Sequence, residues 1–357
     1  MKVVFRVDAS IAMGSGHVMR CLTLAEELRQ RGAVCSFICR EHSGNLISVI
    51  RNKGFEVFNL FLQEEPSNVH GVLSHASWLG ASQKQDSFEC KRVLAELIPD
   101  WLVVDHYALD EVWEEALRKH CRRIMVIDDL ADRKHNCDLL LDQTFGRDYT
   151  DYEPLTTADC VVLCGSDYAL LRAEFSLWRD GALKRRKQGH CNRILVNLGG
   201  VDKDNYTGAV LAVLSKSGLP KDCVITIVMG ITAPWLKDVS VSADSLPWGT
   251  EVKVGVNNMA ELMAESDLAI GASGATSWER CCVGLPSIVI KIASNQNLIA
   301  ENLHRKRAVV LTDLDALPET LRDFVSNLSS NLKAMSSAAG NICDGKGVAR
   351  VVERLYE

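Results

Sequence analysis

The sequence lacks a run of about 18 apolar residues, which is the length a helix needs to cross a bilayer. It opens on the strand-like segment 1–7, where a secretory signal would have a charged region followed by an apolar core. Because of these two absences, the sequence predicts neither membrane insertion nor secretion. We therefore expect a cytoplasmic protein.

An excess of positive charge is also missing, since the net charge is −6 and the isoelectric point is near 5.9. A field of that sign does not attract nucleic acid or an anionic membrane. Low-complexity segments are absent, and the 47% hydrophobic content is that of an ordinary globular protein. Nucleic acid is therefore not an expected partner, and an anionic ligand would need a local binding site.

The thirteen cysteines do not have the spacing of a metal site or a disulfide framework. Their number is odd, and none forms the C-x2-C pair typical of structural zinc. The closest groupings are Cys35 with Cys39, Cys160 with Cys164, and the adjacent pair Cys281 and Cys282. Because most cysteines stand in apolar segments, we expect reduced, buried thiols and no metal.

Apolar, β-rich runs alternate with helical patterns along the whole chain, which predicts an α/β protein with parallel sheets. The first series of expected strands comprises residues 1–7, 34–39, 55–60, 102–104, 124–127, 139–141 and 161–163. The second series comprises residues 194–197, 224–228, 252–256, 268–270, 287–290 and 309–311. Since 357 residues suffice for about two domains, we expect two doubly wound domains.

A basic, polar segment separates the two series of strands and is the expected linker. It places an N-terminal domain at residues 1–183, a linker at 184–192 and a C-terminal domain at 193–357. The last helix, around residues 348–355, is a candidate to pack back across the domains. Open parallel sheets bind ligands outside the carboxyl ends of their strands, so a cleft between the domains is the expected site.

The most informative feature is a glycine-rich turn between the first strand and a helix. Gly14 and Gly16 allow the backbone to approach a ligand closely, and His17 stands where the helix begins. Histidine suits proton transfer near neutral pH, and a helix N-terminus favours an anion. The turn predicts a general base beside an anion site, although a plain tight turn with a capping histidine is the alternative.

A second turn of small residues follows the strand expected at 268–270. Ser273, Gly274, Ala275 and Thr276 offer hydroxyl and backbone donors for a diphosphate, and Glu279 could accept from two ribose hydroxyls. The alternative is a helix cap, with Ser273 or Thr276 as the N-cap and Glu279 as its partner.

Further polar residues stand at expected strand ends. Asp8 and Asp105 are both candidates to orient His17 or to bind sugar, with a structural turn aspartate as the alternative. Arg20 could contact phosphate or form an ion pair with Asp8. Asn295 and Gln296 could contact sugar hydroxyls or cap a helix.

Several motifs occur together and in order, and their combination resembles one known family. The motifs are R-V-D-A-S from residue 6, G-S-G-H-V-M-R from 14, V-V-D-H-Y from 103, I-D-D-L-A-D-R from 127, L-G-G-V-D from 198 and G-A-S-G-A-T-S-W-E-R from 271. This pattern resembles the UDP-2,4-diacetamido-2,4,6-trideoxy-β-L-altropyranose hydrolases of pseudaminic acid biosynthesis. That family is related in fold to the MurG-like GT-B glycosyltransferases, so the resemblance implies a GT-B fold with two domains facing across a cleft.

The resemblance also implies a reaction, a set of site residues and a biological role. UDP would be released from the anomeric carbon with inversion, His17 would be the general base, and the product would serve flagellin or surface glycosylation. In related folds the segment holding Asn258 and Met259 binds the base of the nucleotide, which makes both residues candidates for uracil; a core position is the alternative for Met259. No cofactor is implied.

Metal binding through D-x-D motifs, which some glycosyltransferases use, is not expected here. Asp202 with Asp204, and Asp313 with Asp315, each stand before an expected helix and fit the pattern of caps and first-turn acids. UDP is already a good leaving group, so one base and donors to the diphosphate should suffice. We therefore expect metal-independent catalysis.

Two other functions fit the same motifs. A MurG-like transferase would pass the sugar to an acceptor, but such enzymes usually carry a membrane-docking patch, and no segment clearly supplies one. A nucleotide-sugar-binding protein without catalysis is the third possibility, and the presence of His17 in its glycine turn argues against it. A UDP-sugar is the expected partner in all three cases, and a monomer is the simplest expectation for the oligomeric state.

Overall fold

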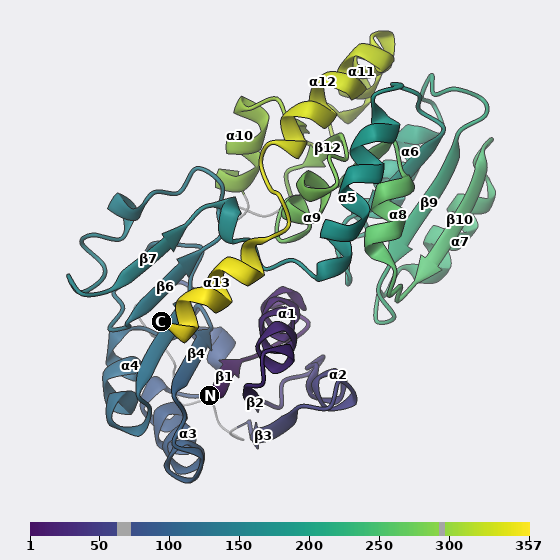
Figure 1. Cartoon of the computed structure of the whole chain (residues 1–357). Coiled ribbons are helices and arrows are strands. Elements are labelled where there is room, and N and C mark those ends of the chain that lie inside the picture. Colours follow the sequence, from purple (N-terminus) through teal and green to yellow (C-terminus); the bar gives the residue numbers. More distant parts are fainter. Residues whose placement is uncertain (63–72, 293–296) are drawn as a thin grey trace. The chain divides into compact units, whose positions relative to one another are not determined.

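A computed structural model describes residues 1–62, 73–292 and 297–357 (Figure 1). The chain divides into two compact units. Unit 1 contains Met1–Leu170 and Gly347–Glu357, and unit 2 contains Leu171–Lys346. Within the described residues, no helix has the length and apolar character needed to span a membrane.

Unit 1 is a parallel α/β unit whose sheet, in the described residues, has the order β3-β2-β1-β4-β5-β6-β7. The strands are β1 (Lys2–Val7), β2 (Val34–Arg40), β3 (Glu56–Leu60), β4 (Trp101–Asp105), β5 (Arg123–Ile127), β6 (Leu139–Asp142) and β7 (Val161–Cys164). The helices are α1 (Gly16–Gln30), α2 (Ile47–Asn52), α3 (Gln83–Leu97), α4 (Glu111–Leu117) and α13 (Gly347–Tyr356), with short 3-10 turns at Ala76–Leu79, Arg118–His120, Tyr149–Asp151 and Ser166–Tyr168.

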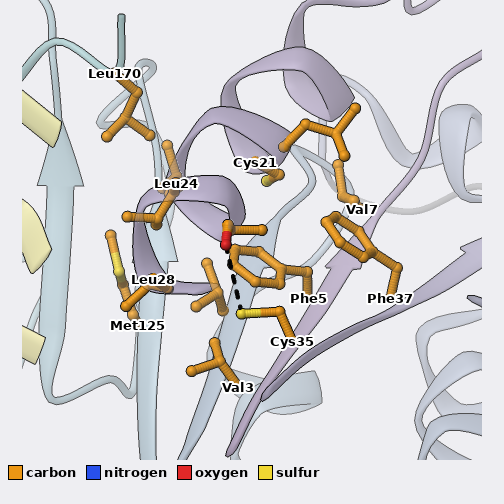
Figure 2. Close-up of a cluster of buried hydrophobic side chains, with 14 of the residues drawn as sticks. Val3, Phe5, Val7, Cys21, Leu24, Leu28, Cys35, Phe37, Met125 and Leu170 are labelled. Carbon is orange, nitrogen blue, oxygen red and sulfur yellow. Dashed lines mark hydrogen bonds between the residues drawn. The ribbon is translucent and has the colours of Figure 1, made fainter. Parts of the chain in front are cut away.

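Alternating side chains of the unit 1 strands bury into two separate clusters, as the period of two in a strand requires. Val3, Phe5 and Val7 of β1 pack with the apolar face of α1 (Figure 2). Val4 of β1 faces the opposite side, where α3 and α4 supply Leu94 and other apolar residues. Because both faces are covered, this sheet is buried as parallel sheets usually are.

Unit 2 repeats the architecture with the strand order β10-β9-β8-β11-β12-β13 in its described residues. Its strands are β8 (Arg193–Asn197), β9 (Val224–Met229), β10 (Gly249–Val254), β11 (Leu268–Ala272), β12 (Ser287–Ile290) and β13 (Val309–Thr312). Its helices are α5 (Ala173–Arg186), α6 (Tyr206–Leu214), α7 (Leu236–Asp244), α8 (Met259–Glu265), α9 (Thr276–Cys282), α10 (Asn297–Arg305), α11 (Leu317–Ser326) and α12 (Leu328–Gly340).

Both sheets reverse their strand order once, and that reversal positions the candidate site residues. The reversal lies between β1 and β4 in unit 1 and between β8 and β11 in unit 2. In doubly wound sheets, ligands bind at the carboxyl ends of the two strands that flank the reversal. The His17 turn follows β1, Asp105 ends β4, and the Ser273 turn follows β11, so the predicted residues lie where this rule expects a ligand.

The strand predictions hold throughout the described chain, with one shift. The strand expected at residues 252–256 is β10, which covers Gly249–Val254. It is the edge strand of its sheet and is only partly buried. A half-exposed edge strand has a weak apolar pattern, so its limits were hard to predict.

The boundary between the units differs from the expected linker at residues 184–192. It falls after Leu170, and α5, which belongs to unit 2, ends at Arg186 within the basic segment. Arg185 and Arg186 point inward and bind carbonyl groups of unit 2, among them the oxygen of Ser266. The segment looked like a solvated connector because its residues are polar, yet those residues anchor a helix.

The C-terminal helix α13 belongs to unit 1, although the preceding segment belongs to unit 2. It packs beside α1 and buries Val348, Val351, Val352 and Leu355 in the same cluster (Figure 1). Trp101 of β4 donates from Nε1 to the Leu355 carbonyl at 2.9 Å. Gly347 is tightly enclosed, since a Cβ there would lie 2.4 Å from the Ala169 oxygen.

Candidate active site

The glycine turn holds His17 at the start of α1. The turn is closed by a Gly14 N–H bond to the Ser10 carbonyl at 2.8 Å, and Gly14 has a φ of +76°. Such a φ disfavours residues with a Cβ. Open space surrounds both Gly14 and Gly16, since a Cβ at either would meet no atom within 4 Å. His17 therefore stands on the first turn of α1, with free space beside the glycines.

Asp105, at the end of β4, is the carboxylate that contacts His17. Its Oδ1 lies 2.6 Å from His17 Nδ1, while the His17 side chain remains 11% exposed. Burial alone would raise the pKa of Asp105, but the Arg20 guanidinium and His17 outweigh it and hold that pKa well below its ordinary value. An ionised Asp105 can only accept a hydrogen bond, which places the proton of neutral His17 on Nδ1.

Arg20, one turn after His17, joins two carboxylates. Its Nε donates to Asp105 Oδ2 at 2.7 Å and its Nη2 to Asp105 Oδ1 at 2.7 Å, while Nη1 contacts Asp129 Oδ2. The paired bonds to Asp105 have the fork geometry that fixes a carboxylate in orientation. The expected alternative partner, Asp8, is not the one Arg20 uses, and the Arg20 side chain is 7% exposed.

Aromatic side chains enclose His17 on one side, and the sequence analysis did not single them out. The ring of Tyr107 meets the His17 ring edge-on at 4.6 Å, and Trp78 stacks on Tyr107 at 5.9 Å. The Tyr107 hydroxyl donates to Asp129 Oδ2 at 2.7 Å. Tyr107 was within the V-V-D-H-Y motif, and its position two residues after Asp105 was the signal that could have identified it.

Asp8 belongs to a buried ion network and not to the His17 contacts. Arg6 Nη1 donates to Asp8 Oδ1 at 2.6 Å, and the same guanidinium contacts Asp86 at 2.6 Å through Nη2. Burial opposes the ionisation of Asp8, but Arg6 and His106 hold its pKa well below the ordinary value. Of the two aspartates proposed to orient His17, Asp105 does so, and Asp8 ties β1 to β2 by accepting from the Arg40 backbone N–H.

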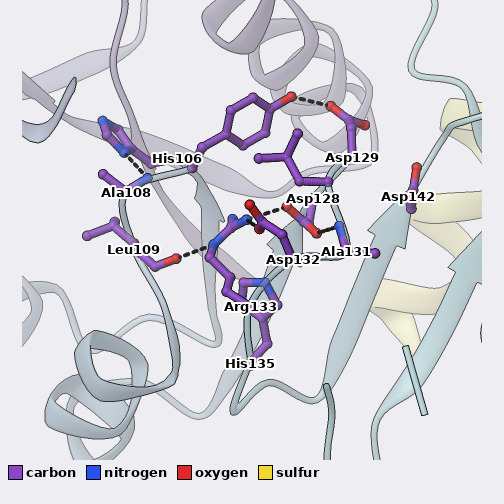
Figure 3. A network of polar contacts seen from close by, with 12 residues as sticks. His106, Ala108, Leu109, Asp128, Asp129, Ala131, Asp132, Arg133, His135 and Asp142 are labelled. Carbon is purple, nitrogen blue, oxygen red and sulfur yellow. Dashed lines mark hydrogen bonds and ion pairs between the residues drawn. The ribbon is translucent and has the colours of Figure 1, made fainter. Parts of the chain in front are cut away.

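The I-D-D-L-A-D-R motif at the end of β5 contains an internal ion network (Figure 3). Arg133 donates to Asp128 Oδ1 at 2.8 Å and to the Leu109 carbonyl at 2.8 Å. Asp129 instead faces Arg20 and Tyr107, so two adjacent aspartates serve different networks.

The turn after β11 is more exposed than its flanking residues. Ser273 is buried and its Oγ lies 3.5 Å from Ser277 Oγ, whereas Gly274, Ala275 and Thr276 are at least partly exposed. Gly274 has a φ of +134°. Ala275 stands at the N-cap of α9 without a side-chain cap bond, so the capping alternative for Ser273 or Thr276 is not what the structure shows.

Glu279 of α9 is partly buried and has an unusual proton affinity. Burial raises its pKa to about 7, although Arg172 and Arg280 oppose that shift. Arg172 Nη2 lies 3.8 Å from Glu279 Oε1, which is a loose ion pair. A carboxyl group of this kind changes charge near neutral pH.

The remaining predicted residues divide into described and undescribed positions. Asn258 is exposed and donates to Glu261 at 2.7 Å, beside half-buried Met259 at the start of α8. Met259 lies outside the described hydrophobic cluster of unit 2, which does not favour its core alternative. Asn295 and Gln296 lie outside the described residues.

The cysteines are free thiols, and Asp202 and Asp313 of the D-x-D motifs accept from backbone N–H groups near helix starts. All thirteen cysteines are free, and ten of them are buried. Asp202 caps α6 by accepting from the Tyr206 and Thr207 backbone N–H groups, and Asp313 accepts from Ala316 N–H. Across the part of the chain that the structure describes, no group of three or more potential ligands is placed to hold a metal ion.

The sequence of this chain is similar to one known domain family and to several known proteins. The model of the glycosyltransferase family 28 C-terminal domain matches residues 225–355. An uncharacterized protein of Methanocaldococcus jannaschii is 26% identical over 81% of this chain, but the match spans only 55% of its own length. The UDP-2,4-diacetamido-2,4,6-trideoxy-beta-L-altropyranose hydrolase of Campylobacter jejuni is 30% identical over 76% of this chain and 85% of its own.

The fold has a counterpart among solved structures. The crystal structure of Acinetobacter baumannii MurG matches with a TM-score of 0.72 and 16% sequence identity, over 99% of each chain. Together with the two doubly wound units, this likeness shows a GT-B fold. Given the extent of the match to the Campylobacter protein, the chain belongs to the GT-B family that includes the UDP-2,4-diacetamido-2,4,6-trideoxy-β-L-altropyranose hydrolase.

Proposed function

We propose that the protein hydrolyses a UDP-linked 2,4-diacetamido-2,4,6-trideoxy-β-L-altrose to UDP and the free sugar, as a step of pseudaminic acid biosynthesis. The 30% identical relative bears the name of that hydrolase. The observation that carries the proposal is the 2.6 Å contact between His17 Nδ1 and the carboxylate of Asp105. It gives the chain an oriented general base at the carboxyl edge of its first sheet.

The contact assigns a role to each ring nitrogen of His17. Asp105 accepts a hydrogen bond from the Nδ1–H group and leaves Nε2 free to take a proton from water. The imidazolium that forms is then stabilised by the adjacent carboxylate. Arg20 fixes Asp105 from its other side, so the base is oriented before substrate arrives.

The leaving group explains why one base is enough. Hydrolysis of an ordinary glycoside needs a second carboxylic acid to protonate an alcohol, whereas a nucleoside diphosphate leaves without protonation. In this proposal the residues from Ser273 to Thr276 donate to the diphosphate, Glu279 accepts from the ribose, and Asn258 with Met259 contacts uracil. Attack by water on the face opposite UDP would invert the anomeric centre, and the reaction would proceed without a metal.

The decisive test is anomeric-proton NMR on the UDP-sugar, without acceptor and in the presence of EDTA, for the wild type and His17→Ala. We expect release of UDP and of the free sugar in its inverted anomeric form by the wild type only. Circular dichroism on both proteins verifies that the variant is folded. Equal turnover by folded His17→Ala would refute the role of His17, and retention of configuration would refute direct attack by water.

A glycosyltransferase is the second candidate, and the match to the glycosyltransferase family 28 C-terminal domain favours it. The same NMR experiment separates the two functions. UDP release that begins only when an acceptor is added would make the protein a transferase. Tight UDP binding without turnover of this sugar, with or without acceptor, would leave a binding role or a different sugar.

A further inference from the structure

Helix α5 carries two arginines, Arg186 buried and Arg179 partly buried, that bind the ends of other helices in unit 2. Arg186 donates to carbonyls at the C-terminal end of α8, with Nε 3.1 Å and Nη2 2.8 Å from the Ser266 oxygen, and it also reaches the Val283 carbonyl after α9. Arg179 donates to the Gly340 oxygen of α12 at 2.6 Å and to the Cys343 oxygen at 2.9 Å. In the described residues, these two guanidiniums donate to carbonyls and not to carboxylates.

A cavity of about 390 Å³ lies beside these arginines, between α5 and α12. Its lining consists of Arg179, Leu183, Arg186, Lys187, Lys333, Ser336, Ser337, Gly340 and Asn341. All nine residues belong to unit 2, and none of them is acidic. The volume falls in the range of about 300 to 1,000 Å³ that is typical of small-molecule sites.

The cavity has a buried base and an exposed rim. Arg186 and Ser336 are 4% and 5% exposed, whereas Lys187, Lys333 and Ser337 are exposed. Leu183 packs closely against α12, because a Cβ on Gly340 would lie 2.9 Å from Leu183 Cδ2. Glycine at position 340 thus lets α5 and α12 approach at one end of the cavity.

The charge of this cavity is not balanced by its surroundings. The ends of α8, α9 and α12 contribute roughly half a negative charge each, about −1.5 in total. Two guanidiniums and two ammonium groups oppose them with four positive charges. Within the described residues, Lys187 and Lys333 have no ion pair, so their charges are available to a ligand.

We propose that this cavity binds a small phosphate-bearing anion. Lys187 and Lys333 supply the charged contacts, Ser336 and Ser337 supply hydroxyl donors, and the guanidiniums of Arg179 and Arg186, held by carbonyls, add a fixed positive field. The site is separate from the turn after β11 and does not depend on the function proposed above.

The test is isothermal titration calorimetry, in which inorganic pyrophosphate is titrated into the full chain in the presence of saturating UDP. UDP is added first so that the proposed nucleotide site does not take up the probe. We expect saturable binding that weakens at least about tenfold in Lys187→Glu/Lys333→Glu, because two attractive charges become repulsive. Ser337→Trp, which fills the rim without changing charge, should also weaken binding.

The matched control is Lys184→Glu/Lys216→Glu, which makes the same change in net charge at two exposed positions outside the lining. Its affinity for pyrophosphate should stay close to that of the wild type. Equal losses in both double variants would show a general charge effect and overturn the site. No saturation below about 10 mM pyrophosphate would overturn it as well.

Discussion

At the residue scale, neighbouring aspartates of similar sequence context have different partners. Asp105 orients His17, Asp129 binds Arg20 and Tyr107, and Asp8 joins the network of Arg6. All three follow or end strands of one sheet, so sequence position alone gives them equivalent roles. Their contacts in the folded chain distinguish the three aspartates. The contact with His17 makes Asp105 the positioning residue whose substitution is most informative.

Asp105→Asn should reduce kcat by roughly 10²- to 10⁴-fold with a smaller change in KM, because an amide can present its N–H to Nδ1 and favour the wrong tautomer. Steady-state kinetics of UDP release measure the effect. Asp129→Asn is the control, since it keeps the His17–Asp105 contact and removes only the negative charge that Arg20 and the Tyr107 hydroxyl contact. A wild-type kcat in folded Asp105→Asn would contradict the assignment.

The raised pKa of Glu279 predicts that UDP binding depends on pH. Its pKa of about 7 means that the carboxylate becomes available as the pH rises through neutrality. If the ionised form accepts from ribose, affinity for UDP should rise about tenfold from about pH 6 to about pH 8.

The comparison protein for this titration is Glu279→Gln. UDP itself titrates in the same range, but that contribution is common to both proteins and cancels in the ratio of their affinities. Calorimetric titrations across the range give this ratio. A ratio that does not change with pH would mean that Glu279 does not contact the nucleotide as a carboxylate.

At the element scale, α5 shows how a polar segment can be a structural anchor. Its basic residues end the helix where the carbonyls of α8 and α9 are otherwise without partners. Helix ends leave their last carbonyls unsatisfied, and arginine can bind several of them at once. The interactions of Arg186 therefore fix α5 to unit 2.

Arg186→Met should lower the free energy of unfolding by at least about 3 kcal/mol, because several charge-assisted hydrogen bonds are lost and buried carbonyls remain without donors. Urea denaturation measures the loss as a fall in the midpoint. Lys187→Met is the matched control, since Lys187 is adjacent and exposed, and it should change stability by no more than about 0.5 kcal/mol. Similar midpoints for the two variants would rule out the anchoring role.

At the scale of the whole molecule, the chain leaves unit 1 after Leu170 and returns to it at Gly347. Unit 1 therefore contains both termini, and its core is completed only by the last helix. Val351 and Val352 are fully buried among residues of that core. Unit 1 thus requires the C-terminal helix for its full stability, whereas unit 2 is continuous in sequence.

Val351→Asp should destabilise unit 1 selectively, because it places a charge in an apolar core without a partner. Differential scanning calorimetry should show one transition moving to lower temperature while the other stays in place. The exposed neighbour Glu353, changed to Gln, should leave both transitions unaltered. A uniform shift of the entire profile would argue against separate roles for the two units.

The sequence by itself determined the local structure and singled out His17 as the candidate base. Strand and helix periodicities depend on neighbours in sequence, so every expected strand is found, and the glycines before His17 mark its turn. The tertiary structure decided the rest. Asp105 lies 88 residues from His17, and Trp78 stacks on Tyr107 from 29 residues earlier in the chain, so neither contact leaves a local signal.

The same reason governs how the chain is divided into its two units. A basic segment is polar whether it is solvated or bound to helix ends, and only the positions of distant carbonyls distinguish the two cases. The return of α13 to unit 1 likewise depends on a core assembled from β1, α1 and β4. Local sequence patterns determined whether each segment forms a strand or a helix. Long-range packing determined which of these elements contact one another, because contacts between residues distant in sequence form only when the chain is folded.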